Sequence, residues 1–169
     1  MAGDSGWQIR FSKSPDRCQL SDRDLSGGLH GQDDSLQERN EGLNDSPPFA
    51  AHLGMYAGIS ADGVATVNMP IRDHHLQDSG NVQGGLIVTL VDYAFYLAVK
   101  SRLSPGQSTV TVELKVNFIA GAKEGALTAS ARVVSGGRRI FVVEGDVIDS
   151  DGVIVARGLS TYLVSEARP

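Results

Sequence analysis

The pattern of hydrophobic and polar positions divides the chain into two parts. Residues 1–46 are polar and show no sustained periodicity, and a segment of this kind buries too little apolar surface to offset the entropy of ordering it. We therefore predict a flexible N-terminal extension. The alternative is an arm that packs on a partner subunit, because Trp7, Ile9 and Phe11 alternate as in a short strand. Residues 47–169 are regularly patterned and are expected to form one domain.

One long apolar segment dominates the second part. Residues 84–101 contain no Gly or Pro after their start and are too many for a typical strand, so they predict a helix. Because the segment is apolar nearly all round, the helix should be enclosed on most sides. The apolar stretch from Leu86 to Val99 is shorter than the roughly 20 residues that cross a membrane. We therefore expect a buried helix and no membrane partner.

Segments on either side of this helix predict strands. Before it, residues 55–60 and 64–70 flank the turn sequence ADG and are expected to form a hairpin, which follows a short helix near Pro48. After it, short turns separate the remaining segments, which favours antiparallel pairing. Four further strands are expected at residues 109–118, 126–134, 140–148 and 153–164.

The order of these elements predicts an α+β fold, in which an antiparallel sheet of about six strands wraps around one long central helix. The chain has no alternating βαβ pattern, so a doubly wound fold is not expected. In the first strand after the helix, one apolar face is expected to be buried and to consist of Val110, Val112, Leu114, Val116 and Phe118.

Composition narrows the choice of partners and compartment. The net charge of −5 does not indicate a nucleic-acid partner. A single cysteine, Cys18, excludes a disulfide scaffold, and the first 17 residues lack the apolar segment of a secretory signal, so a reducing cytoplasm is expected. His74 and His75 are adjacent in a polar loop and are expected to face solvent, because their spacing does not suit a metal. No metal site and no cofactor are predicted.

Two features of the helical segment are candidates for chemistry. Asp92 is the only charged residue between Gly84 and Val99, and a carboxylate in an apolar site needs a partner or a use. A capping or core-linking Asp, or one that faces water on a narrow stripe of the helix, explains it equally well. Gly84 and Gly85 stand where the helix starts, where unpaired N–H groups and the helix dipole can stabilise an oxyanion. Glycine pairs also occur at ordinary loop–helix junctions.

The spacing of these two features has a geometric consequence. Gly84 and Asp92 are eight residues apart, which is about 12 Å along a helix axis. That is too far for both to act on one carbonyl group. If both are catalytic, they must come from different chains, so the spacing predicts an active site shared across a two-fold dimer.

The segment GNVQGGLIVTLVDYAFYLAVKS resembles the motif of the PaaI-like branch of hotdog thioesterases, which is Gly-x-Val/x-His-Gly-Gly followed by an Asp nine residues after the His. Gln83 stands at the His position, and Asp92 follows nine residues later. The resemblance extends from about Pro48 to Val164 and includes the phrase TVELKVNFIAGAKEGALTASARVV. It implies a hotdog fold, hydrolysis of acyl-CoA thioesters, and a homodimer that often pairs into a homotetramer.

The resemblance also implies a division of labour. Asp92 would act as general base toward water or attack the thioester directly, and the Gly84 N–H would polarise the thioester carbonyl. Thr111, with Thr109 as a substitute, would support the site. Gln77 would help hold the nucleophile, acting with Gly84 on the Asp92 and Thr111 of the other subunit.

The sequence departs from the family at two positions. Gln83 replaces the usual His; an amide keeps hydrogen bonding but cannot titrate. Gln77 replaces the usual Asn, which moves an amide by one methylene group. Both departures bear on rate and substrate choice more than on reaction type. Further substrate contacts are expected from Gly85, Asn81, Tyr96, Arg138 and Arg139.

Two rivals to a thioesterase remain open. The first is a non-catalytic protein of the same fold that binds or senses acyl-CoA; residues 1–46 lack the periodic helices and basic face of a DNA-binding extension. The second is a hotdog hydratase acting on enoyl-CoA, whose Asp-x-Asn-x-x-His motif does not occur here.

Overall fold

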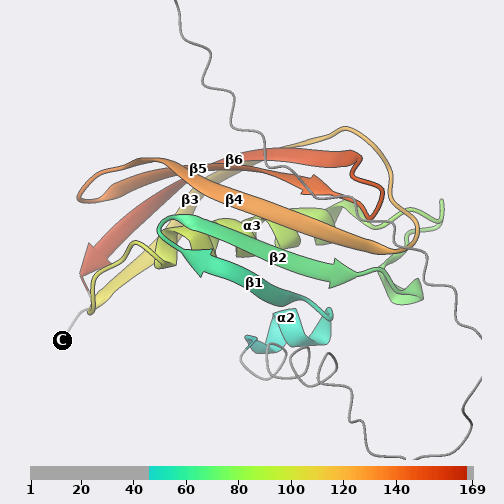
Figure 1. Ribbon diagram of the computed structural model, residues 1–169, viewed down its shortest axis with the longest axis horizontal. Coiled ribbons are helices and arrows are strands. Elements are labelled where there is room, and N and C mark those ends of the chain that lie inside the picture. The colour runs from blue at the N-terminus through green and yellow to red at the C-terminus, as the bar shows by residue number, and fades with distance from the viewer. Residues whose placement is uncertain (1–45, 167–169) are drawn as a thin grey trace, which may run out of the picture. The chain divides into compact units, whose positions relative to one another are not determined.

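The computed structural model describes residues 46–166 (Figure 1). The predictions for Trp7, Ile9, Phe11 and Cys18 lie outside the described residues and are not tested. The described elements are, in chain order, α2 (Pro48–His52), β1 (Tyr56–Ala61), β2 (Val64–Pro70), the 3-10 helix η1 (Asp73–His75), α3 (Gly84–Lys100), β3 (Gln107–Phe118), β4 (Ala126–Gly136), β5 (Ile140–Ile148) and β6 (Ile154–Glu166).

The six strands form one antiparallel sheet in the order β1-β2-β4-β5-β6-β3. Figure 1 shows the sheet curving around α3. The predicted fold class, a six-stranded antiparallel sheet wrapped around one long helix, is confirmed. Most of α3 is enclosed, and its buried residues are Ile87, Leu90, Val91, Tyr93, Ala94, Phe95, Ala98 and Val99.

The hairpin of β1 and β2 follows from its turn sequence. Asp62 and Gly63 both have positive φ angles, 50° and 80°, which a two-residue turn of type I′ requires and which Asp-Gly favours. The turn places the two strands in antiparallel register. The predicted hairpin and the short helix before it are both confirmed.

Two facing glycines bring α3 close to the sheet. Gly145 on β5 pairs with Gly158 on β6, and the ring of Phe95 lies over both. A Cβ atom at Gly145 would lie 2.9 Å from Phe95 Cε1, and one at Gly158 would lie 3.1 Å from Phe95 Cζ. Because no side chain fits between ring and strands, Phe95 fixes the helix against the centre of the sheet. Asp92, one turn earlier on the helix, is thereby held at a fixed place relative to β6.

The buried face expected for residues 109–118 is wrong at Val110, Val112 and Phe118, which are exposed, whereas Leu114 and Val116 are half-buried. Val110 and Val112 are 60% and 59% exposed. The register with β6 shifts between Thr111 and Glu113, so Val112 is an extra residue in a β-bulge. A bulge of one residue exchanges the faces on its two sides. Thr111 therefore points toward α3, as Leu114 does after the bulge, and Val110 points away.

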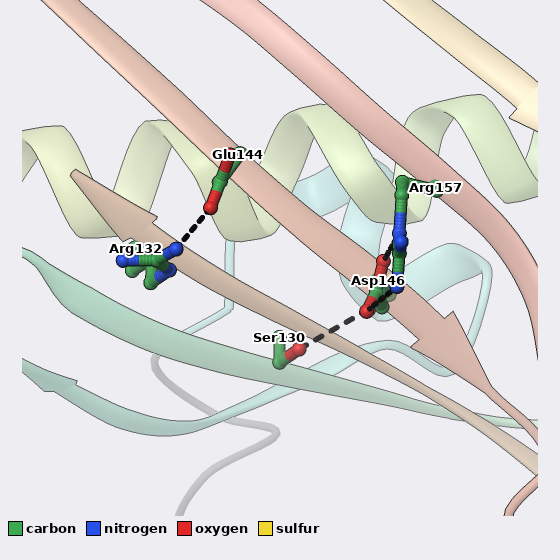
Figure 2. Close-up of polar contacts among 5 residues, drawn as sticks. All are labelled: Ser130, Arg132, Glu144, Asp146 and Arg157. Atoms are coloured by element: carbon green, nitrogen blue, oxygen red, sulfur yellow. Dashed lines mark hydrogen bonds and ion pairs between the residues drawn. The ribbon is translucent and has the colours of Figure 1, made fainter. Parts of the chain in front are cut away.

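The opposite face of the sheet carries several polar and charged side chains. Figure 2 shows its side chains in front of the strands with α3 behind them. Arg157 Nε donates to Asp146 Oδ1 at 2.6 Å, and an ion pair joins Arg132 to Glu144. Ser130 Oγ donates to the Asp146 carbonyl oxygen at 3.3 Å. Exposed ion pairs of this kind contribute little to stability, so they mark a solvated surface rather than a site.

Candidate active site

Asp92 lies on the least buried stripe of α3. The stripe follows helical spacings of three and four residues, and it contains exposed Gly85, Tyr96 and Lys100 with half-buried Thr89 and Asp92. The helix is thus enclosed on most sides, as predicted, and the side that stays open carries its single internal carboxylate.

Two hydroxyl groups hold the Asp92 carboxylate. Thr111 Oγ1 donates to Asp92 Oδ1 at 3.0 Å, and Tyr162 Oη donates to the same oxygen at 2.9 Å. Thr111 and Tyr162 are directly opposite each other on β3 and β6, so their side chains project to the same face of the sheet. Thr109, the alternative to Thr111, instead donates to the Leu163 carbonyl oxygen at 3.2 Å.

Tyr162 is a residue that sequence reasoning missed. It is fully buried on β6, and a buried tyrosine hydroxyl usually has a hydrogen-bond partner. The predicted last strand contains one tyrosine, so this rule could have marked Tyr162 as a residue that binds a polar group in the core. Burial, followed by the charge of Asp92, raises the pKa of Tyr162 well above its ordinary value. The hydroxyl therefore stays protonated and acts as a donor.

At the start of α3, the two candidate oxyanion donors are the N–H groups of Gly84 and Gly85, and they differ in whether they already have an acceptor. Gln83 caps the helix, and its Oε1 accepts the Gly85 N–H at 3.0 Å. The Gly84 N–H is one of the helix-terminal donors without an intrahelical partner, and no hydrogen bond to it is found within residues 46–166. The ring of Phe118, 57% exposed, lies against Gly84, since a Cβ there would be 3.3 Å from Phe118 Cζ. Only the Gly84 N–H is available to a ligand.

The loop before α3 is more ordered than its polar sequence suggests. Leu76 and Val82 form an isolated β-bridge. Gln77 Nε2 and Asn81 Nδ2 both donate to Ser79 Oγ, at 3.0 and 3.1 Å. These two predicted site residues therefore lie together, at the end of the helix that carries Gly84.

The expectation that His75 faces solvent is wrong, because His75 is fully buried. Its Nδ1 accepts the Arg72 N–H at 3.2 Å, and its carbonyl oxygen accepts the Gln83 N–H at 2.9 Å. Burial lowers the pKa of His75, and the neighbouring charges of His74 and Arg72 add to this. The backbone carbonyl of His75 thus anchors Gln83, which caps α3, while the imidazole holds the Arg72 N–H. His74 is exposed, as expected.

The remaining predicted substrate contacts are exposed. Arg138 and Arg139 lie in the turn between β4 and β5, and neither forms an ion pair with another described residue. The Arg139 carbonyl oxygen accepts the Val164 N–H at 2.7 Å. Tyr96 is 36% exposed, and Lys100 Nζ lies 5.8 Å from the centre of its ring.

The candidate site residues thus form two separate half-sites in one chain, and the first of them includes Tyr162, which was not predicted. The first half-site consists of Asp92, Thr111 and Tyr162. The second lies at the start of α3 and consists of Gln77, Asn81, Gln83 and Gly84. About 12 Å of helix separates Asp92 from Gly84. The first half-site can activate water or attack a carbonyl carbon, and the second can bind a carbonyl oxygen.

No helix among the residues described is long and apolar enough to cross a membrane. In the same part of the chain, no three His, Cys, Asp or Glu side chains are grouped so that they could hold a metal ion.

Comparison with known proteins shows the class to which this fold and site belong. Residues 79–156 match the sequence model of the Thioesterase superfamily. A Saccharolobus solfataricus protein named for an inferred esterase activity is 39% identical over 130 residues, which cover 77% of this chain and 85% of that protein. The chain belongs to the thioesterase superfamily and is a thioester hydrolase by family.

Two further relatives place it within that superfamily. The structure of a variant of the phenylacetic acid degradation protein PaaI from Thermus thermophilus is similar with a TM-score of 0.64 at 28% identity, over 69% of this chain and 98% of that one. Acyl-coenzyme A thioesterase 13 of Pongo abelii is 27% identical over 75% of this chain and 92% of that protein. The chain is PaaI-like, as its motif predicts.

Proposed function

We propose that this chain is an acyl-CoA thioesterase, which hydrolyses its substrate to a carboxylic acid and CoA. The observation that carries the proposal is Asp92, a carboxylate on the open stripe of a buried helix, held through one oxygen by two hydroxyl groups. Family membership supplies the thioester chemistry, and the name of the acyl-CoA thioesterase relative supports CoA as the thiol.

The complete site is proposed to form between two copies of the chain. β3 has 12 residues and lies at an edge of the sheet, where Val110 and Val112 are exposed. A long unpaired apolar edge is suited to pairing with another strand. Thr111, in the first half of β3, contacts Asp92, and Phe118, at the C-terminal end of the strand, covers Gly84.

Antiparallel pairing of two such strands around a two-fold axis would place the Thr111 end of one beside the Phe118 end of the other. The Asp92 half-site of one subunit would then face the Gly84 half-site of its neighbour. In this arrangement the Gly84 of one subunit and the Asp92 of the other can act on the same carbonyl group, which the two residues of one helix are too far apart to do. The dimer is then the active unit.

In the proposed reaction the thioester carbonyl oxygen accepts the free Gly84 N–H. Asp92 takes a proton from a water molecule as the water oxygen bonds to the carbonyl carbon. The oxyanion that forms is stabilised by the N–H and by the positive end of the helix dipole. It then collapses, the C–S bond breaks, and CoA leaves as a thiolate that takes up the proton held by Asp92, which regenerates the carboxylate.

The alternative for the first step is direct attack by Asp92, which expels the thiolate and forms an anhydride that water cleaves. Both routes consume one thioester and one water and yield one acid and one thiol. Gln83 takes no part in proton transfer, because its amide does not titrate and its Oε1 is engaged with the Gly85 N–H. Arg138 and Arg139 are proposed to bind the CoA phosphates.

The experiment that tests the proposal is the release of free thiol by the purified protein with short, medium, long and aryl acyl-CoAs, together with calorimetric binding of CoA. Stoichiometric formation of acid and thiol with at least one acyl group is expected. Binding of acyl-CoA without thiol release would establish the sensing protein instead. Hydration of an enoyl-CoA without thiol release would establish the hydratase.

A further inference from the structure

Among the described residues, Thr111 and Tyr162 donate to the Asp92 carboxylate, and Tyr162 has no place in the family motif. Its hydroxyl oxygen lies 2.9 Å from Asp92 Oδ1 and 3.2 Å from the Asp92 carbonyl oxygen. That carbonyl already accepts an N–H bond within the helix. A bond to a carboxylate is the stronger of the two because it is assisted by charge. The single hydroxyl hydrogen of Tyr162 therefore belongs mainly to Oδ1.

The two oxygens of the carboxylate are consequently unequal. Oδ1 accepts from both Tyr162 and Thr111, whereas no hydrogen bond to Oδ2 is found among residues 46–166. Tyr162 itself is fully buried, and its ring pairs across the sheet with Thr111 on one side and Phe141 on the other. The rigid sheet thus fixes Oδ1, and Oδ2 is the oxygen left to face the open side of α3.

We propose that Tyr162 is a positioning residue of the thioesterase site. Its hydroxyl anchors Asp92 Oδ1, so that Oδ2 is the oxygen that reacts with water or with the thioester. The inference rests on the proposed function of Asp92. Burial raises the pKa of Tyr162, so its hydroxyl remains a hydrogen-bond donor, and its proposed role includes no proton transfer. Its contribution is to hold the ionised carboxylate in one orientation.

The competing explanation is that Tyr162 is only a core residue whose hydroxyl found a partner. Tyr162→Phe separates the two, because it keeps the ring and removes only the hydroxyl. The matched control is Tyr93→Phe. Tyr93 is a second buried tyrosine, 7% exposed, whose ring packs edge-on against Phe49 at 5.4 Å between centroids.

For Tyr162→Phe we expect kcat to fall about 10- to 100-fold, the usual effect of losing a hydrogen bond to a charged group, with little change in KM. We also expect the pH dependence of kcat/KM to change, because the hydroxyl group that fixes the reacting carboxylate is missing. Replacing Tyr162 by 3-fluorotyrosine, which keeps the ring and a hydroxyl donor, should keep kcat near that of the wild type. Tyr93→Phe should change melting temperature alone.

A second readout does not depend on turnover. The carboxyl carbon of Asp92, observed by ¹³C NMR at one fixed pH, should have a different chemical shift in Tyr162→Phe than in the unmodified protein and Tyr93→Phe, because its Oδ1 loses a donor. If wild-type protein hydrolyses thioesters while Tyr162→Phe matches Tyr93→Phe in kcat, pH profile and chemical shift, the positioning role is overturned and the thioesterase stands. If wild-type protein hydrolyses none, the proposed function falls, and the chemical shift alone decides whether Tyr162 holds the carboxylate.

Discussion

Replacing Gly84 by proline would delete the one free N–H at the start of α3. Gly84 is the first helical residue, a position where proline is tolerated. Gln83 before it has φ −61° and ψ 129°, the extended conformation that a following proline requires. The helix should therefore persist while the proposed oxyanion donor is lost. Loss of one such donor costs about 10²- to 10³-fold in kcat, or ~2.7–4 kcal/mol of transition-state stabilisation.

Gly84→Ala is the matched control for this change. Its Cβ would meet Phe118 Cζ at 3.3 Å, as the proline Cβ would, but it retains the N–H. The exposed ring of Phe118 can move by the few tenths of an ångström needed, so kcat should stay within a few-fold of wild type. Thiol release gives kcat and KM, and thermal unfolding monitors the fold. Wild-type kcat in Gly84→Pro, or an equal loss in Gly84→Ala, would refute the assignment of the oxyanion donor.

Three other predictions follow from the geometry. Mixing equal amounts of Asp92→Asn and Gly84→Pro subunits should restore about a quarter of wild-type turnover, because half of the dimers are mixed and each mixed dimer has one intact site out of two. No recovery after subunit exchange would argue for a site within one chain. Gly158→Ala should lower the free energy of unfolding by about 1–3 kcal/mol, because its Cβ would lie 3.0–3.1 Å from side chains of α3. The control Gly137→Ala should leave that free energy unchanged, since its Cβ would make only an ordinary 3.7 Å contact. Denaturant titration measures the free energy of unfolding of both variants. Burial lowers the pKa of His75 in the folded protein, so as pH falls this side chain is protonated first in the unfolded chain. The free energy of unfolding should therefore fall as pH drops below about 6.5 and level off below the pKa of the folded state. His75→Gln should lack that component in the same titration run at several pH values, and an unchanged pH slope would contradict it.

The fold could be predicted because its signals are local. A single apolar segment of helical length and several alternating segments separated by short turns are read directly from neighbouring residues, and both are present in the structure. The exception is β3, where the bulge at Val112 reverses the faces. Alternation continues unbroken through this residue in the sequence, so nothing local reveals that one position has been inserted.

The site was less predictable because its contacts are distant in sequence. Asp92 stands out as a lone charge, but Tyr162 is 70 residues away from it, and only the sheet register brings them together. Asp92 and Thr111 meet for the same reason, since the bulge turns Thr111 rather than Val110 toward the helix. His75 was misjudged because adjacent histidines in a polar loop give no sign that one of them is enclosed.

The central claim is that Asp92 is the catalytic carboxylate, and the most direct measurement is thiol release by Asp92→Asn beside wild type on the best acyl-CoA substrate. Asn keeps the size and the acceptor oxygen for Thr111 and Tyr162, so melting temperature and CoA binding should be nearly unchanged. Loss of a general base or nucleophile should lower kcat by about 10²- to 10⁴-fold. A folded Asp92→Asn protein with near-wild-type kcat would contradict the account.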